Sequence, residues 1–205
     1  MAATSRVPGY AGGALWFSGT NGMVVVPQTP SIVTGAAITI SAKVWRDVPS
    51  NPPADYFPTI FSYLYSSNDV GHYLFFGVEP GAGLVADLSG CWLGKEMVTG
   101  RWEHVAMTVN AGQLAAYVGT NRISYSCGGF STSEQNIYIG WYPDPQYNAH
   151  WSGKIDDVRI HKSGWSAAQM LDLSEPWNDL DGDGITTLQE CQNGCNPNMD
   201  DTDQD

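Results

Sequence analysis

The end of the chain carries carboxylates at a spacing that could bind a metal ion. In the twelve residues that start at Asp179, acidic side chains occupy positions one, three, five and twelve, and Gly184 occupies position six. A calcium loop uses this spacing to wrap oxygen ligands around one ion, with a backbone carbonyl from position seven and a further contact from position nine. We therefore expect a Ca2+ site whose ligands are Asp179, Asp181, Asp183, Ile185, Thr187 and Glu190. A disordered acidic tail would explain the charge of this segment but not its spacing.

A second segment, residues 141–150, has a composition that could bind a sugar. Two prolines stiffen it, and aromatic rings alternate with side chains that form hydrogen bonds. A pyranose needs both, because its apolar face stacks on aromatic rings while its hydroxyls need hydrogen-bonding partners. The candidate ligand-binding residues are Trp141, Tyr142, Asp144, Tyr147, Asn148 and His150. The alternative is that these rings only cover the open end of a sandwich.

The acidic residues of the first 174 positions do not form the pair that a glycosidase needs. A retaining glycosidase places two carboxylates about 5 to 5.5 Å apart across the scissile bond. No Glu here is followed two residues later by Asp or Glu, and the isolated ones are typical of solvated surface carboxylates: Glu79, Glu96, Glu103 and Glu134. We expect no catalytic residues. A lyase that uses His72, Tyr73 or His104 stays as an alternative.

Short β-strands must position these segments. Apolar residues alternate with polar ones along residues 38–45 and 104–109, which predicts half-buried strands. Further strands are expected at 14–17, 23–26, 60–65, 72–78, 84–88, 114–118, 122–126, 136–141 and 154–161, with turn residues between them. Strands never alternate with helices, so we expect an all-β sandwich of two antiparallel sheets. One short helix is predicted after the last strand, where Ser166 and Gln169 can form a capping box.

Charge divides the chain into two regions. Of the 21 acidic residues, nine follow residue 174, where there is no Lys or Arg. We therefore expect a β-domain at 1–174 and a calcium-binding region at 175–205. The net charge of -12 argues against a nucleic acid or an anionic membrane as the partner. No apolar run is long enough to cross a bilayer, so we expect no membrane insertion.

The four cysteines suggest an oxidising, extracellular compartment. Four cysteines permit three pairings, and we favour Cys91 with Cys127 and Cys191 with Cys195, because each pair lies within one of the two regions. The alternative, four free thiols in a cytosolic protein, is disfavoured by the polar surroundings of Cys191 and Cys195.

Several stretches of the first region resemble a known family. Residues 14–27, 38–45, 100–109 and 153–160, followed by 166–170, are similar in order and spacing to the laminin G-like, concanavalin A-like jelly-roll domains of secreted bacterial proteins. The resemblance implies a jelly roll of two curved antiparallel sheets. It also implies a carbohydrate- or protein-binding role, with a calcium ion commonly bound between the last strand and the turn at 19–21. The aromatic residues Trp16, Trp102 and Trp151 stand where this family carries core aromatics, so we assign them to packing.

Asp156 is a second candidate calcium ligand. Strict alternation places it on the same face as Val158 and Ile160, which should point to the core. A carboxylate on that face must be paired, bound to metal or satisfied by hydrogen bonds. The alternative to a metal is that Asp156 accepts hydrogen bonds from backbone N–H groups.

The acidic region resembles a different family. It lacks the apolar residue at position eight and the flanking amphipathic helices of an EF-hand. With residues 193–198 and the restarting Asp201, Asp203 and Asp205, it is similar to the thrombospondin type 3 calcium repeats of secreted bacterial proteins. Such repeats form calcium-stiffened linkers, and the chain stops inside the next repeat. We therefore expect other domains in a longer parent protein.

Together these observations favour a secreted or cell-surface binding module over an enzyme. The expected function is non-catalytic binding of a polysaccharide or other glycan, with Ca2+ stabilising the module. A calcium-dependent adhesion module that binds protein is the first alternative. A polysaccharide-cleaving enzyme is the second, and the missing carboxylate pair argues against it.

Overall fold

The computed structural model describes most strands and turns of the chain. The described residues are 4–10, 12–27, 37–47, 57–64, 73–79, 83–88, 91–95, 97, 99–119, 121–126, 136–143, 149–166 and 169–170, without the side chains of 64, 73, 74, 79, 83, 87, 88 and 91–95. The chain divides into two compact units, residues 1–165 and 166–205. The thirteen strands found among these described residues all belong to the first unit.

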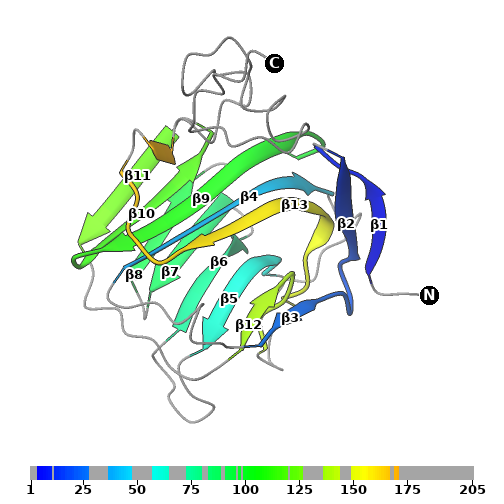
Figure 1. Ribbon diagram of the computed structural model, residues 1–205, viewed down its shortest axis with the longest axis horizontal. Coiled ribbons are helices and arrows are strands. Elements are labelled where there is room, and N and C mark those ends of the chain that lie inside the picture. The colour runs from blue at the N-terminus through cyan, green and yellow to red at the C-terminus, as the bar shows by residue number, and fades with distance from the viewer. Residues whose placement is uncertain are drawn as a thin grey trace, which may run out of the picture. The chain divides into compact units, whose positions relative to one another are not determined.

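One layer of the first unit is a seven-stranded antiparallel sheet (Figure 1). Among the described strands, the last one in the sequence lies inside this sheet, between an early strand and a central one. In spatial order the sheet consists of β1 (Thr4–Pro8), β2 (Gly13–Ser18), β13 (Ser152–His161), β4 (Ile38–Arg46), β9 (Trp102–Asn110), β10 (Gln113–Val118) and β11 (Asn121–Ser126).

The other layer is a six-stranded antiparallel sheet. In spatial order it consists of β3 (Val24–Val26), β12 (Ile137–Ile139), β5 (Thr59–Leu64), β6 (Tyr73–Glu79), β7 (Gly83–Leu88) and β8 (Cys91–Lys95). The two sheets form a jelly-roll sandwich, which confirms the predicted all-β class. The strands β1 and β8 were not predicted from the sequence. Each lies at one edge of its sheet.

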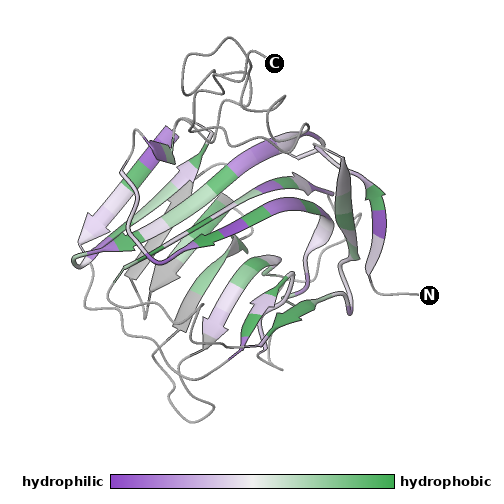
Figure 2. Ribbon diagram, in the orientation of Figure 1, coloured by the Kyte–Doolittle hydropathy of each residue, from purple (hydrophilic) through white to green (hydrophobic). Residues whose placement is uncertain are grey.

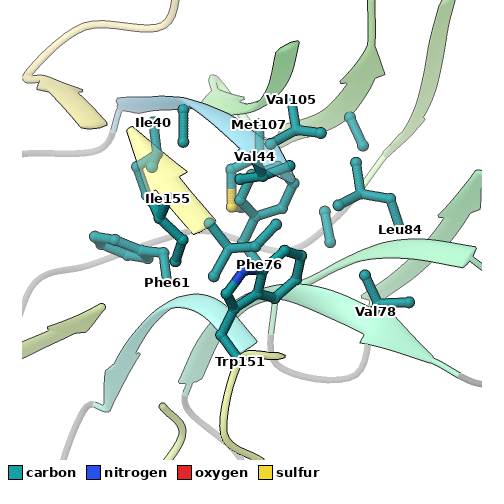
Figure 3. Close-up of a cluster of buried hydrophobic side chains, with 14 of the residues drawn as sticks. Ile40, Val44, Phe61, Phe76, Val78, Leu84, Val105, Met107, Trp151 and Ile155 are labelled. Atoms are coloured by element: carbon teal, nitrogen blue, oxygen red, sulfur yellow. The ribbon is translucent and has the colours of Figure 1, made fainter. Parts of the chain in front are cut away.

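The core lies between the two sheets (Figure 3). Figure 2 shows apolar residues alternating with polar ones along the strands. The alternation in β4 and β9 was predicted correctly. Ile38, Ile40 and Ala42 lie opposite Val109, Met107 and Val105, Val44 continues the same face of β4, and all seven are buried. The six-stranded sheet contributes Phe61, Phe76, Val78 and Leu84. Trp151, the residue before β13, is fully buried among them, as its assignment to packing predicted.

Strand β4 is buried on both faces, whereas half-burial was predicted. On the face away from the core, Thr39 is 0% and Lys43 is 5% exposed. The segment after β13 crosses one end of β4, where the Thr39 hydroxyl donates to the Ser163 carbonyl (2.7 Å) and accepts from the Trp165 N–H (2.9 Å). At the other end, Lys43 lies against the ring of Tyr10. Alternation in one strand cannot reveal a cover that comes from distant segments.

The predicted capping contacts form at the start of the second unit. The Ser166 N–H donates to Oε1 of Gln169 (2.9 Å), and the Met170 N–H donates to the Ser166 carbonyl (3.1 Å). Residues 169 and 170 have helical backbone, but the part of the chain that the structure describes contains no complete helix. Accordingly, none of its helical segments is long and apolar enough to cross a membrane.

Candidate functional site

The end of β12 is anchored by backbone and side-chain hydrogen bonds. The Gly140 N–H donates to the Ile60 carbonyl (3.0 Å), and the Trp151 N–H donates to the Gly140 carbonyl (2.9 Å). The Ser62 hydroxyl donates to the Trp141 carbonyl (2.7 Å). Because Trp151 is part of the core, these bonds tie the segment after β12 to the rigid part of the sandwich.

Four half-buried rings gather at this place, and we call them the β12 aromatic cluster: Tyr138, Trp141, Tyr142 and His150. Trp141 stacks on His150, with ring centroids 5.8 Å apart and planes 14° apart. Tyr138 meets Trp141 edge to face at 5.4 Å, and Tyr142 meets Phe75 in the same way at 5.7 Å. Such arrangements are favourable beyond the area they bury. The rings are therefore held in place before any ligand arrives.

The cluster lies on the face of the six-stranded sheet that points away from the core. Ile137 points to the core, so its neighbour Tyr138 points outward. In register, Tyr138 lies opposite Ser62, and Ser62 lies opposite Phe75. The alternation of residues 137–139 is the sequence signal that places Tyr138 on this face.

His150 completes the cluster as a neutral ring. Its Nδ1 lies 3.2 Å from the Gly22 carbonyl, to which it donates a hydrogen bond. Burial lowers the pKa of His150, and the Gly22 carbonyl opposes that shift. At neutral pH the ring stacked on Trp141 is therefore uncharged.

The structure brings together three of the six predicted ligand-binding residues. Trp141, Tyr142 and His150 lie in one cluster, while Asp144, Tyr147 and Asn148 lie outside the described residues. The predicted calcium loop from Asp179 to Glu190 also lies outside them, as do Cys127, Cys191, Cys195 and the side chain of Cys91. These metal and disulfide assignments stay predictions. Within the described ranges, no three His, Cys, Asp or Glu residues form a group that could hold a metal.

Asp156 points away from the core, so its predicted orientation was wrong. A β-bulge between Asp156 and Arg159, where Asp157 has a φ of 48°, inserts one residue and reverses the face. Asp156 therefore lies opposite Lys43. Its Oδ2 accepts from the Tyr10 N–H and its Oδ1 from the Asp157 N–H, both at 2.8 Å. Asp156 thus accepts hydrogen bonds from backbone N–H groups, which was the predicted alternative to a metal. A calcium-binding role for Asp156 stays a prediction.

Two tryptophans that were assigned to packing also face outward. Trp16, Lys154, Trp45 and Trp102 are directly opposite one another on β2, β13, β4 and β9, and we call them the outer tryptophan row. All four are half-buried, on the face of the seven-stranded sheet that points away from the core. The row depends on the pairing of four strands that are distant in sequence, so no local pattern predicts it.

Two of the residues considered for catalysis are buried in the sheet. Glu103 was expected to be solvated, but it is 8% exposed and forms an ion pair with Arg101. Burial, with Lys43 and Arg159 nearby, lowers the pKa of His104 to about 3. A base with that pKa is a poor proton acceptor near neutral pH. His72 and the side chain of Tyr73 lie outside the described residues.

Comparison with known proteins gives one family and several similar folds. The family model described as the concanavalin A-like lectin/glucanases superfamily matches residues 18–170. A comparison with curated proteins gave no match.

Among solved structures, domain 4 of the extracellular arabinanase AbnA from Geobacillus stearothermophilus, in complex with arabinotriose, is 20% identical. Its TM-score is 0.65, over 85% of this chain and 82% of that one. The CBM40 of the Ruminococcus gnavus IT-sialidase, bound to alpha2,3 sialyllactose, is 10% identical, with a TM-score of 0.63 over 78% of this chain and 96% of that one. The binding domain of Paraclostridial Mosquitocidal Protein 1 is 15% identical, with a TM-score of 0.64 over 87% of this chain and 47% of that one. At these identities the likeness concerns the fold.

Proposed function

Because this chain belongs to the concanavalin A-like lectin/glucanases superfamily, we propose that it is a non-catalytic carbohydrate-binding module. The observation that carries this proposal is the β12 aromatic cluster. Its rings are half-buried, fixed by hydrogen bonds and mutual packing, and placed on an outward face where a sugar can reach them. A preorganised aromatic platform binds a pyranose without the cost of ordering mobile side chains.

Two further observations support a glycan as the ligand. The arabinanase domain holds arabinotriose and the sialidase module holds sialyllactose, so this sandwich can support a sugar site. Two residues that were considered for catalysis also have structural surroundings. Glu103 forms an ion pair with Arg101, and His104 is a buried base whose pKa is low. The alternatives are a protein-binding adhesion module and a polysaccharide-cleaving enzyme.

The Trp141→Ala variant should lose affinity for the glycan that the wild-type chain binds by about tenfold or more. Stacking on an aromatic ring is worth roughly 1 kcal/mol or more beyond its buried area, and about 1.4 kcal/mol corresponds to a factor of ten. The ligand would first be found on a glycan array that includes arabino-oligosaccharides and sialyllactose, with and without calcium. Titration calorimetry on the strongest hit then compares the two chains.

The matched control is Tyr125→Ala, since Tyr125 is an aromatic residue on β11 that is 61% exposed and lies on the other sheet. Its affinity should equal that of the wild type. If Trp141→Ala keeps full affinity and melts several degrees lower, the cluster has only a packing role and the proposal fails.

We further propose that the acidic region binds calcium as a thrombospondin type 3-like repeat, in a secreted or cell-surface protein with other domains. The support is the spacing of Asp179, Asp181, Asp183 and Glu190 around Gly184. In that setting the repeat stiffens the link to a neighbouring domain, and the four cysteines form two disulfides.

One calcium ion should bind the loop with a Kd of about 10⁻⁴ M or tighter, as extracellular loops do. Asp181→Ala removes the ligand at position three, so the calorimetric stoichiometry should fall by one site. Glu175→Gln removes an acid of the same region outside the loop and should change nothing. Calcium removal should unfold residues 175–205 and leave the β-domain folded. An unchanged stoichiometry in Asp181→Ala would contradict the assignment.

A further inference from the structure

The outer tryptophan row has the geometry of a second ligand platform. Its four members occupy adjacent strands at one level of the sheet, in the order Trp16, Lys154, Trp45 and Trp102. Neighbouring strands are about 4.8 Å apart, so the row spans roughly 14 Å. That length suits a short linear chain of sugar units lying across the strands.

A cation lies at the centre of this row. Nζ of Lys154 is 4.8 Å from the centroid of the Trp45 ring and 5.9 Å from that of Trp102, and the two rings meet edge to face at 6.1 Å. An ammonium has three N–H donors, and a ring face satisfies them only weakly. Among the described residues, no carboxylate forms an ion pair with Lys154. The ammonium of Lys154 can therefore donate a hydrogen bond to an anionic ligand.

The Trp45 ring is fixed at its edge. Its Nε1–H donates to Oδ1 of Asp47 (3.1 Å). Tyr10 meets Trp102 edge to face at 6.2 Å. Both tryptophans are thus oriented by neighbours, while Lys154 lies over the face of Trp45.

This sheet face collects positive charge in an acidic protein. Four of the nine basic residues of the chain point to it, Lys43, Lys154, Arg122 and Arg159, although the net charge of the chain is -12. All four have described partners: Arg159 forms an ion pair with Asp157 (2.8 Å), Lys43 lies over Tyr10, Arg122 donates to the Tyr117 hydroxyl (3.1 Å) and Lys154 lies over Trp45. The carboxylate of Asp156 is on the same face, opposite Lys43. Against the carboxylates of Asp156 and Asp157 these four cations still leave a local excess of positive charge, which favours anionic ligands at this face.

We infer that the outer tryptophan row is a binding site for an acidic saccharide, whose rings stack on the tryptophans while a carboxylate or sulfate group pairs with Lys154. This site is separate from the β12 aromatic cluster, because the two lie on different sheets. A negative result at one of the two sites would therefore not contradict the proposal for the other.

The test compares ligands that differ only in charge. Wild-type protein is titrated with trigalacturonate and with its methyl ester, and in a second arm with sulfated and unsulfated galactan oligosaccharides. We expect the acid to bind about tenfold more tightly than the ester, the scale of one charge-assisted hydrogen bond. The arm with the larger difference identifies the anionic group.

Variants then test whether Lys154 causes the difference in affinity between the charged and the neutral ligand. Lys154→Met keeps the length of the side chain and should lower affinity for the acidic ligand about tenfold, to that of the neutral one. Lys154→Arg keeps the charge and should bind like the wild type. Lys162→Met removes an exposed lysine just after β13, so it has the same net charge as Lys154→Met and should have no effect. Trp141→Ala should also leave this affinity unchanged.

Three results would overturn the inference. The first is no binding of either anionic ligand, and the second is equal affinity for the charged and neutral forms. The third is an equal loss in Lys154→Met and Lys162→Met, which would indicate a general charge effect. Thermal melts of all variants verify that each one is folded at the titration temperature.

Discussion

Replacing Trp151 with alanine is expected to lower the free energy of unfolding by about 3–5 kcal/mol, the usual cost of removing a buried tryptophan. Trp151 is 0% exposed and lies among core residues of both sheets, including Phe61, Phe76 and Met107 (Figure 3). Its removal leaves a cavity that the surrounding strands can fill only in part. Chemical denaturation at pH 7 measures the loss, and the melting temperature should fall by roughly 10 °C.

Replacing Trp151 with phenylalanine distinguishes the effect of lost side-chain volume from the effect of the buried N–H donor. Within the described part of the chain, Nε1 of Trp151 has no hydrogen-bond partner. Trp151→Phe removes this buried donor and keeps most of the ring, so it should cost clearly less than alanine. Tyr125→Ala, at an exposed position, should change stability by less than about 0.5 kcal/mol. Equal losses in Trp151→Ala and Tyr125→Ala would contradict the placement of Trp151 in the core.

Acid is expected to destabilise the β-domain through His104. Burial, followed by the charges of Lys43 and Arg159, lowers the pKa of His104 from 6.5 to about 3. In the unfolded chain the ring takes up a proton below pH 6.5, while in the folded chain it stays neutral until much lower pH. The stability from its neutral form is therefore complete above pH 6.5 and is lost as the pH falls toward 3. At pH 4.5 the loss should be roughly 2 kcal/mol.

The His104→Gln variant isolates this contribution. Glutamine does not titrate, so the variant should lose roughly 2 kcal/mol less than the wild type between pH 7 and pH 4.5. His161→Gln serves as the comparison, because burial and Arg159 also lower the pKa of His161, which is half-buried. Its effect should have the same sign and be smaller. Parallel stability curves for the wild type and His104→Gln would show that His104 does not cause the acid sensitivity.

Alternation along single strands was enough to determine much of the fold from the sequence alone. The apolar face of β4 and β9 and the all-β class follow from a period of two, because a strand next to a core must present one face to it. The aromatic segment that starts at Trp141 was also visible locally, since its residues are close in sequence. Three of its six predicted members lie in one cluster.

Only the tertiary structure decided which side chains meet across strands. The bulge at Asp157 reversed the face of Asp156, and one inserted residue suffices because side chains alternate with a period of two. The covers over Thr39 and Lys43 come from segments more than a hundred and about thirty residues away, respectively. The outer tryptophan row combines β2, β13, β4 and β9, whose register is set by the packing of the whole sandwich. The periodicity of a sequence shows which residues share a face of one strand. A binding surface, by contrast, forms when several strands pair, and these strands are distant from one another in the sequence.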